Sequence, residues 1–149
     1  MARIDLLKKG DILPVLHLPE VSGEDDRLTG FRGHRNLVLF LTHPVGCAAC
    51  EGKLRELNDA LELLRGEAAE VLAIVPGPRE KVVELKRRLV LAFPVLFDAG
   101  TALNDKAVLV VADRFGEIFA LIGADSEHRL PTAAMIAEEL AFVAMQCPE

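Results

Sequence analysis

Short apolar runs alternate along this chain with stretches in which hydrophobic positions recur every three or four residues. Residues 36–42, "NLVLFLT", and residues 70–76, "EVLAIVP", are continuous apolar runs of strand length, which is typical of parallel strands buried on both faces. Between them, residues 47–65 follow the helical pattern, and Gly66 is suited to end a helix. The apolar positions of that pattern are Leu54, Leu57, Leu61 and Leu64. This order predicts a strand, a helix and a second strand.

The second half of the chain continues the alternation. Pro78 suits the first turn of a helix that we expect to run to about Leu91. Residues 93–98, "FPVLFD", predict a short strand, and residues 106–123 predict a hairpin whose turn is at residues 114–116. Pro131 then opens a last helix. The apolar positions of the two helices are Val82, Leu85, Leu89, Ile136, Leu140 and Val143.

Before these elements comes a lead-in at residues 10–35, which is interrupted by Gly and Pro and has a possible small hairpin around Ser22 to Asp26. The full order is lead-in, β, α, β, α, β, β, α, an α/β arrangement with βαβ units and a mainly parallel sheet. Because the first strand is a buried apolar run, we expect it in the middle of the sheet. No repeat or linker divides residues 1–149, so we expect a single domain.

The composition and net charge of the chain argue against nucleic-acid and membrane binding. The chain has 149 residues, 51% of them hydrophobic, and a formal net charge of −6, which disfavours binding to nucleic acid or to an anionic membrane. Its N-terminus lacks the apolar region of a secretory signal, and apolar runs such as residues 107–112 are too short to span a bilayer. We therefore expect a cytoplasmic protein with no membrane and no nucleic-acid partner.

The candidate chemistry is in "VGCAACEGKLREL", residues 45–57, where Cys47 and Cys50 form a C-x-x-C pair. In a reducing cytoplasm this spacing indicates redox or metal chemistry in preference to a structural disulfide. The pair lies where the first strand leads into its helix. A helix N-terminus presents unpaired N–H groups and a partial positive charge that stabilise a thiolate, and open α/β proteins place their sites at this edge of the sheet. Glu51 in the first turn opposes that effect, and Lys53 or His43 could offset it.

Together, the order of elements, the C-A-A-C, the lead-in "GDILPVLHLPEVSG", "FPVLFD" and the "VVADRFGEI" hairpin resemble a redoxin. The likeness is to the peroxiredoxin-like branch of the thioredoxin superfamily, which contains alkyl hydroperoxide reductase and thiol-specific antioxidant (AhpC/TSA). It covers about Gly10 to Val143. It implies a thioredoxin fold, with a central mixed sheet flanked by helices.

The resemblance also implies an enzyme, a thiol-dependent oxidoreductase that reduces hydroperoxides or disulfides in cell redox homeostasis. Cys47 matches the attacking thiolate of this superfamily, and Cys50 matches the second cysteine of a C-x-x-C motif, which would resolve the mixed disulfide or sulfenic acid formed at Cys47. A thiol electron donor such as a thioredoxin-like protein would reopen the resulting disulfide. No cofactor is expected.

Some positions depart from the family's patterns. Peroxiredoxins usually have Thr or Ser three residues before the attacking cysteine and Pro seven before it, and this chain has Pro44 and Phe40 there, with Thr42 nearby. Where peroxiredoxins place a peroxide-binding arginine, and thioredoxins a cis-proline, we find residues 106–108, "KAV". The thioredoxin Trp and the Pro within its motif are replaced by Gly46 and two alanines. Peroxide and protein disulfide both remain open as substrates.

Other residues receive auxiliary or alternative interpretations. His43 could tune the Cys47 thiolate, Thr42 is a possible auxiliary residue, and Cys147 is a possible extra resolving cysteine. The remaining histidines, His17, His34 and His128, are interpreted as surface or satisfied histidines. Soft-metal (Cu or Zn) binding or a metal-chaperone role is an alternative, with His128 a candidate only by its distance along the chain, and we assign no metal site. A non-catalytic interaction module on a thioredoxin scaffold is the other alternative.

Overall fold

The structure is a computed structural model that describes residues 4–14, 18–21, 35–98, 106–125 and 129–145. It has five strands: β1 (Asn36–Leu41), β2 (Ala69–Pro76), β3 (Val95–Asp98), β4 (Val108–Ala112) and β5 (Ile118–Gly123). Its α-helices are α2 (Ala48–Asp59), α3 (Leu61–Gly66), α4 (Arg79–Leu89) and α5 (Ala133–Met145), and a 3₁₀ helix, η1 (Ile4–Leu6), precedes them. No helix in the described residues is both long enough and apolar enough to cross a bilayer.

The strands form one mixed sheet in the order β3-β2-β1-β4-β5. β1 pairs in parallel with β2, and β2 with β3, whereas β4 is antiparallel to both β1 and β5. β1 is therefore the central strand, as its uninterrupted apolar sequence predicted. The α/β class and the thioredoxin-type mixed sheet are confirmed.

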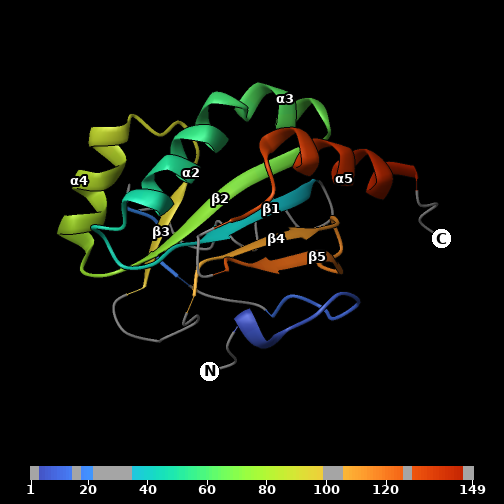
Figure 1. Cartoon of the computed structure of the whole chain (residues 1–149), viewed down its shortest axis with the longest axis horizontal. Helices are drawn as coiled ribbons and strands as arrows, with labels where there is room; N and C mark the ends of the chain where they lie inside the picture. The colour runs from blue at the N-terminus through green and yellow to red at the C-terminus, as the bar shows by residue number, and fades with distance from the viewer. Residues whose placement is uncertain (1–3, 15–17, 22–34, 99–105, 126–128, 146–149) are drawn as a thin grey trace.

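The two faces of the sheet are covered by different parts of the chain (Figure 1). All four α-helices pack on one face, where Val38 and Phe40 of β1 contribute to the larger core. Leu37, Leu39 and Leu41 point to the other face, where the described residues that cover them include Ile4 of η1 and Leu13 and Leu18 of the lead-in. Because both faces are buried, residues 37–41 of β1 are all apolar, and they do not alternate with polar positions.

The predicted helix over residues 47–65 is wrong in one respect, because it is two helices that meet at Ala60. Asn58 and Asp59 at the end of α2 are weaker helix formers than the leucines and charged residues before them. The Asn58 side chain donates to the carbonyl of Val90 (3.0 Å) and accepts from the N–H of Ala92 (2.8 Å). These bonds hold the end of α2 against the loop that follows α4.

The hairpin turn at residues 114–116 is confirmed. The N–H of Gly116 donates to the carbonyl of Asp113 (3.0 Å), and Gly116 has a positive φ of 90° that favours glycine. The Asp113 carboxylate accepts from the N–H groups of Phe115 and Glu117, so this aspartate shapes the turn. The small hairpin predicted around Ser22 to Asp26 lies outside the described residues.

Candidate active site

A short loop carries the chain from β1 at the centre of the sheet into α2. Thr42 follows β1, and its hydroxyl donates to the carbonyl of His43 (2.7 Å). Gly46 has a φ of 113°, which glycine adopts without strain, and Cys47 is the N-cap residue of α2 with extended backbone. This path places Cys47 at the helix N-terminus, as the strand-to-helix pattern predicted, and Thr42 in the loop behind it.

Three side chains converge at this junction. The Nδ1 atom of His43 lies 3.6 Å from the Sγ of Cys47 and 3.5 Å from the Sγ of Cys50. Each sulfur also faces a backbone donor: the N–H of Cys50 donates to the Cys47 sulfur, and the N–H of His43 donates to the Cys50 sulfur, both at 3.4 Å. His43 is therefore in contact with both members of the dithiol and can exchange a proton with either.

The two cysteines differ in exposure. Cys47 is partly exposed, whereas Cys50 is 4% exposed and belongs to the core on the helical face of the sheet. Burial raises the pKa of Cys50 to about 12, with further increases from the neighbouring Cys47 and Glu51, and the N–H of His43 acts in the opposite direction. Cys50 is thus held as a neutral thiol at physiological pH. Cys47 is the cysteine that an external reagent can reach.

Glu51, the acidic residue beside the dithiol, is paired. Arg88 of α4 donates two bonds to its carboxylate, at 2.8 and 3.0 Å. This hydrogen bond lowers the pKa of Glu51, and the guanidinium compensates the negative charge that would oppose a thiolate nearby. Sequence reasoning identified Glu51 as a complication but missed Arg88, since no pattern links residues 37 positions apart.

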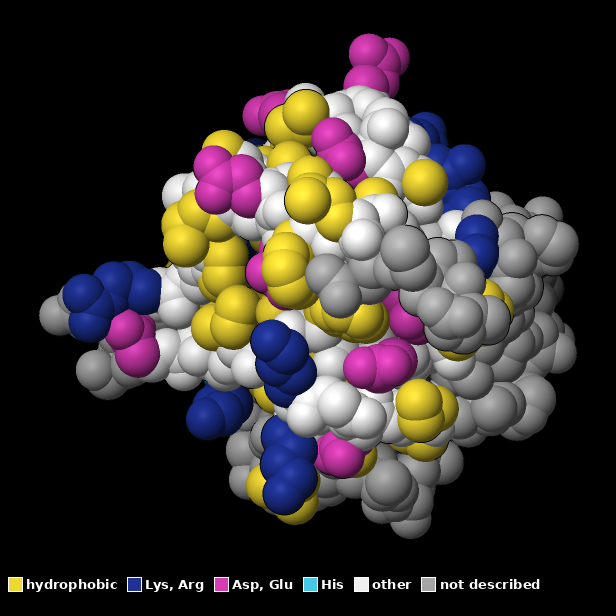
Figure 2. Space-filling view, turned by 90° about the vertical axis from the view of Figure 1, so that its right-hand side faces the viewer, with side chains coloured by type: hydrophobic (Ala, Val, Ile, Leu, Met, Phe, Trp, Pro, Cys, Tyr) yellow, Lys and Arg dark blue, Asp and Glu magenta, His cyan; other side chains and the backbone are white. Residues whose placement is uncertain are grey.

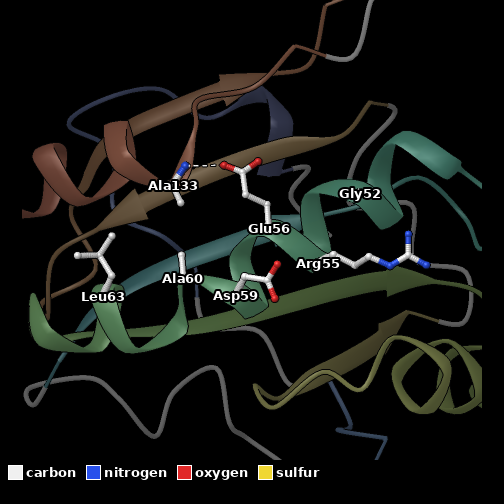
Figure 3. A pocket seen from close by; sticks show the side chains of 7 residues that line it. All are labelled: Gly52, Arg55, Glu56, Asp59, Ala60, Leu63 and Ala133. Carbon is white, nitrogen blue, oxygen red and sulfur yellow. Dashed lines mark hydrogen bonds between the residues drawn. The ribbon is translucent and has the colours of Figure 1, made fainter.

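Further along α2, polar contacts fasten the helix to the start of α5. Lys53 donates to Glu56 and to the carbonyl of Pro131, both at 2.8 Å, and the N–H of Ala133 donates to Glu56 at 2.6 Å. Figure 3 shows Glu56 pointing from α2 toward Ala133, while Arg55 points away along the helix. These residues border an open cavity of about 590 Å³ whose lining contains none of the three site residues. The contacts fix the position of α2, and hence of Cys47, relative to the sheet.

The exposed residues next to Cys47 in the sequence are small and uncharged. Pro44, Gly46, Ala48 and Ala49 are all exposed, and none carries a charged or bulky side chain. The larger exposed apolar side chains of α3 and α5 lie at the end of the molecule away from the start of α2. Figure 2 views this end and shows hydrophobic side chains gathered on it. This group includes Leu63, Met135, Phe142 and Met145. Cys47 is therefore partly open to an approaching molecule, and these four apolar side chains belong to α3 and α5.

The structure describes most of the site residues that the sequence predicted. Cys47, Cys50 and His43 come together, and Thr42 lines the same small cavity. Cys147, His17, His34 and His128 lie outside the described residues. Ala107, at the position of the thioredoxin cis-proline, is buried beside the first residue of β4, and its carbonyl accepts from the N–H of Ala124 (2.8 Å).

Comparisons with known proteins identify a family and a fold. The family model described as AhpC/TSA family matches residues 9–140. Peroxiredoxin Bcp of Escherichia coli K12 is 34% identical over 92 residues, which are 62% of this chain and 58% of that protein. Among solved structures, peroxidoxin BcpB from Mycobacterium tuberculosis superposes with a TM-score of 0.79 at 18% identity, covering 95% of this chain and 99% of that one. A reduced 2-Cys peroxiredoxin of Plasmodium vivax gives the same TM-score at 14% identity, covering 93% and 97%.

Proposed function

The chain belongs to the AhpC/TSA family, and we propose that it is a thiol peroxidase in which Cys47 attacks a hydroperoxide and Cys50 resolves the product. The observation that carries the proposal is the pair of sulfurs at the start of α2, one partly exposed and one buried, both in contact with His43. The name of the Escherichia coli relative, peroxiredoxin, favours peroxide over disulfide as the substrate. The match spans 58% of that relative, and the proposal rests on this chain's own pair of cysteines.

In the first step, the Cys47 thiolate attacks one oxygen of the hydroperoxide. An S–O bond forms, the O–O bond breaks, and Cys47 becomes a sulfenic acid. The leaving alkoxide needs a proton, and His43 Nδ1, 3.6 Å from the Cys47 sulfur, can carry the proton taken from the thiol to that oxygen. At the helix N-terminus, the N–H of Cys50 donates to the Cys47 sulfur at 3.4 Å.

In the second step, the Cys50 sulfur attacks Cys47. An S–S bond forms, the S–O bond breaks, and the hydroxide leaves with the Cys50 proton as water. A disulfide needs the two sulfurs about 2.05 Å apart, and here they lie within 4.8 Å of one another. Cys47, as the N-cap residue, lies outside the helical backbone, so rotation of its side chain can close this gap without unwinding α2.

Reopening the disulfide requires two electrons from outside. We propose a thiol donor such as a thioredoxin-like protein, for which the small exposed residues on either side of Cys47 leave room. We also propose a cytoplasmic location, where such donors keep thiols reduced. The single sheet that runs from Asn36 to Gly123 supports our interpretation of residues 1–149 as one domain.

A second candidate function is disulfide reduction by the same two cysteines. It is favoured by Pro44, which occupies the position where peroxiredoxins usually carry Thr or Ser, and by the C-x-x-C spacing itself. In that reaction the Cys47 thiolate attacks a substrate disulfide, and Cys50 releases the mixed disulfide. The two functions share Cys47 and Cys50 and differ in the first oxidant.

The deciding experiment compares hydrogen peroxide with a model disulfide as oxidants of the reduced protein. Cys147→Ser is present in all samples, so that two thiols remain, and Cys50→Ser is the matched variant. We expect Cys47 to be oxidised by peroxide much faster than a free thiol, with a Cys47–Cys50 disulfide as the product and a sulfenic acid on Cys47 in the Cys50→Ser protein. If peroxide oxidises Cys47 no faster than a free thiol, while the model disulfide exchanges rapidly with it, disulfide reduction is the function. If neither oxidant leaves an adduct on Cys47 in the variant, both are wrong.

A further inference from the structure

The three atoms at the start of α2 are also a set of soft metal donors. His43 Nδ1, Cys47 Sγ and Cys50 Sγ all lie within 4.8 Å of one another. Thiolate and imidazole are the ligands of tetrahedral zinc sites in proteins. The His43 ring presents Nδ1 to both sulfurs, as a shared metal ion requires.

The separations agree with one ion at the centre of these donors. With Zn–S about 2.3 Å and Zn–N about 2.05 Å at a tetrahedral angle, the nitrogen and each sulfur are about 3.5 Å apart. The observed distances from His43 Nδ1 are 3.6 Å to Cys47 and 3.5 Å to Cys50. The two nitrogen–sulfur edges of a zinc tetrahedron are therefore already present in the fold.

The surroundings suit ligated thiolates. The N–H groups of Cys50 and His43 each donate to one of the sulfurs, which stabilises negative charge there and orients both ligands. Beside them is a cavity of about 10 Å³, lined in part by Val45, Leu54 and Leu85, that has room for about one water-sized particle. This space is the size of a single ion or water molecule.

We propose that the reduced protein binds one Zn²⁺ ion through His43 Nδ1, Cys47 Sγ and Cys50 Sγ. Binding displaces the two thiol protons to solvent, and both Zn–S bonds are made to thiolates. The described residues supply three donors, so the fourth position of the ion is left for water or a small thiol. This site goes beyond the proposed peroxidase and does not depend on it.

Metal binding and the dithiol reaction exclude one another. A Cys47–Cys50 disulfide removes both thiolates, so only the reduced protein can hold the ion. A bound ion in turn occupies the Cys47 electron pair that attacks an oxidant. The oxidised form of the same chain is consequently a matched control that differs only in one S–S bond.

The test is a zinc titration of the full chain, with Cys147→Ser, in competition with a chromophoric chelator and under a phosphine reductant. The proteins are the parent, His43→Ala, His43→Asn and Cys50→Ser, each checked for folding by thermal melting in excess chelator. Loss of a residue that merely orients a ligand weakens metal binding about 10- to 100-fold, so loss of a ligand itself is expected to raise Kd more than about 100-fold. Cobalt(II) is the spectroscopic probe, with expected tetrahedral bands and sulfur-to-cobalt charge transfer.

We expect one Zn²⁺ per reduced chain, no binding by the disulfide form, and recovery after reduction. Lack of stoichiometric binding by the reduced parent, or unchanged affinity in both His43 variants, would overturn the inference. A protein that fails to bind zinc but forms the Cys47–Cys50 disulfide with peroxide would refute the metal site and leave the peroxidase intact. Zinc binding without reaction at Cys47 in the metal-free protein would support the metal site and refute the peroxidase.

Discussion

The two ends of α2 have different roles: the N-terminal end presents Cys47, and the C-terminal half holds the helix in place. At its N-terminal end, Cys47 lies outside the helical backbone, is partly exposed and has small uncharged neighbours. Its C-terminal half is fastened by side chains: Glu56 to the N–H of Ala133, and Asn58 to the loop after α4. A reactive sulfur must be reachable and able to move toward its partner, and the helix that presents it must stay in place. Accessibility and rigidity are therefore supplied by different residues of one helix.

The largest effect is expected at the reactive end. Cys47→Ser removes the nucleophile, so the rate at which the reduced protein consumes hydroperoxide should fall on the order of 10³-fold or more, as for other catalytic nucleophiles. The thermal midpoint should change little, because Cys47 is partly exposed. Stopped-flow oxidation and thermal melting of the same preparations check both statements. Retained activity would show that the reactive end has been placed incorrectly.

Cys47 and Cys50 should differ in their reactivity toward an alkylating reagent. Because burial raises the pKa of Cys50 to about 12, its thiolate fraction at pH 8 is on the order of 10³-fold below that of an ordinary cysteine. With limiting iodoacetamide, Cys47 should be labelled first, and labelling of Cys50 should rise only as the pH approaches 12. Peptide mapping of the reduced protein over a pH series measures this directly. Equal labelling at pH 8 would contradict the buried, protonated state of Cys50.

A substitution at the C-terminal, anchored end of α2 should lower the stability of the fold and leave the rate of Cys47 oxidation almost unchanged. Glu56→Gln weakens the bonds from Lys53 and Ala133, and since the Glu56 side chain is 37% exposed, we expect a loss of only about 1 kcal/mol after discounting for solvent screening. The matched control is Glu62→Gln, an exposed change on α3 that should stay within about 0.5 kcal/mol. Urea unfolding and the rate of Cys47 oxidation are the two readouts. A tenfold lower rate of Cys47 oxidation with unchanged stability would contradict the assignment of Glu56 to a purely anchoring role.

The same variant has a defined pH dependence. Burial alone would raise the pKa of Glu56, but hydrogen bonds from Lys53 and the Ala133 N–H lower it below the ordinary value of 4.5. The folded chain therefore holds this proton less tightly than the unfolded chain. The contribution of Glu56 is full above the unfolded pKa of about 4.3 and is lost as the pH falls through the lower folded value. The stability difference between parent and Glu56→Gln should accordingly shrink below about pH 4.

The sequence predicted the reactive end much better than the anchored one. β1, the start of α2 and the C-x-x-C depend on residues close together in the chain, whose apolar runs and spacing are visible directly. The anchoring bonds join Lys53 to Pro131 and Glu56 to Ala133, 78 and 77 positions apart, and no periodicity reports such contacts. His43 was a candidate by proximity, but its contact with both sulfurs depends on the path of a loop, which has no pattern. The break at Ala60 was missed because the leucine spacing continues through it.

The smallest expected effect concerns Glu51, the charge beside the dithiol. Glu51→Gln removes negative charge near the sulfurs and should speed Cys47 oxidation, whereas Arg88→Ala leaves the carboxylate uncompensated and should slow it, each by up to about threefold because the pair is near the surface. The double variant should match Glu51→Gln alone, since Arg88 acts only through that carboxylate. Raising the salt concentration should reduce all three differences. Slow oxidation of the double variant would instead mean that Arg88 holds α4 against α2, and the guanidinium would then belong with the anchoring contacts.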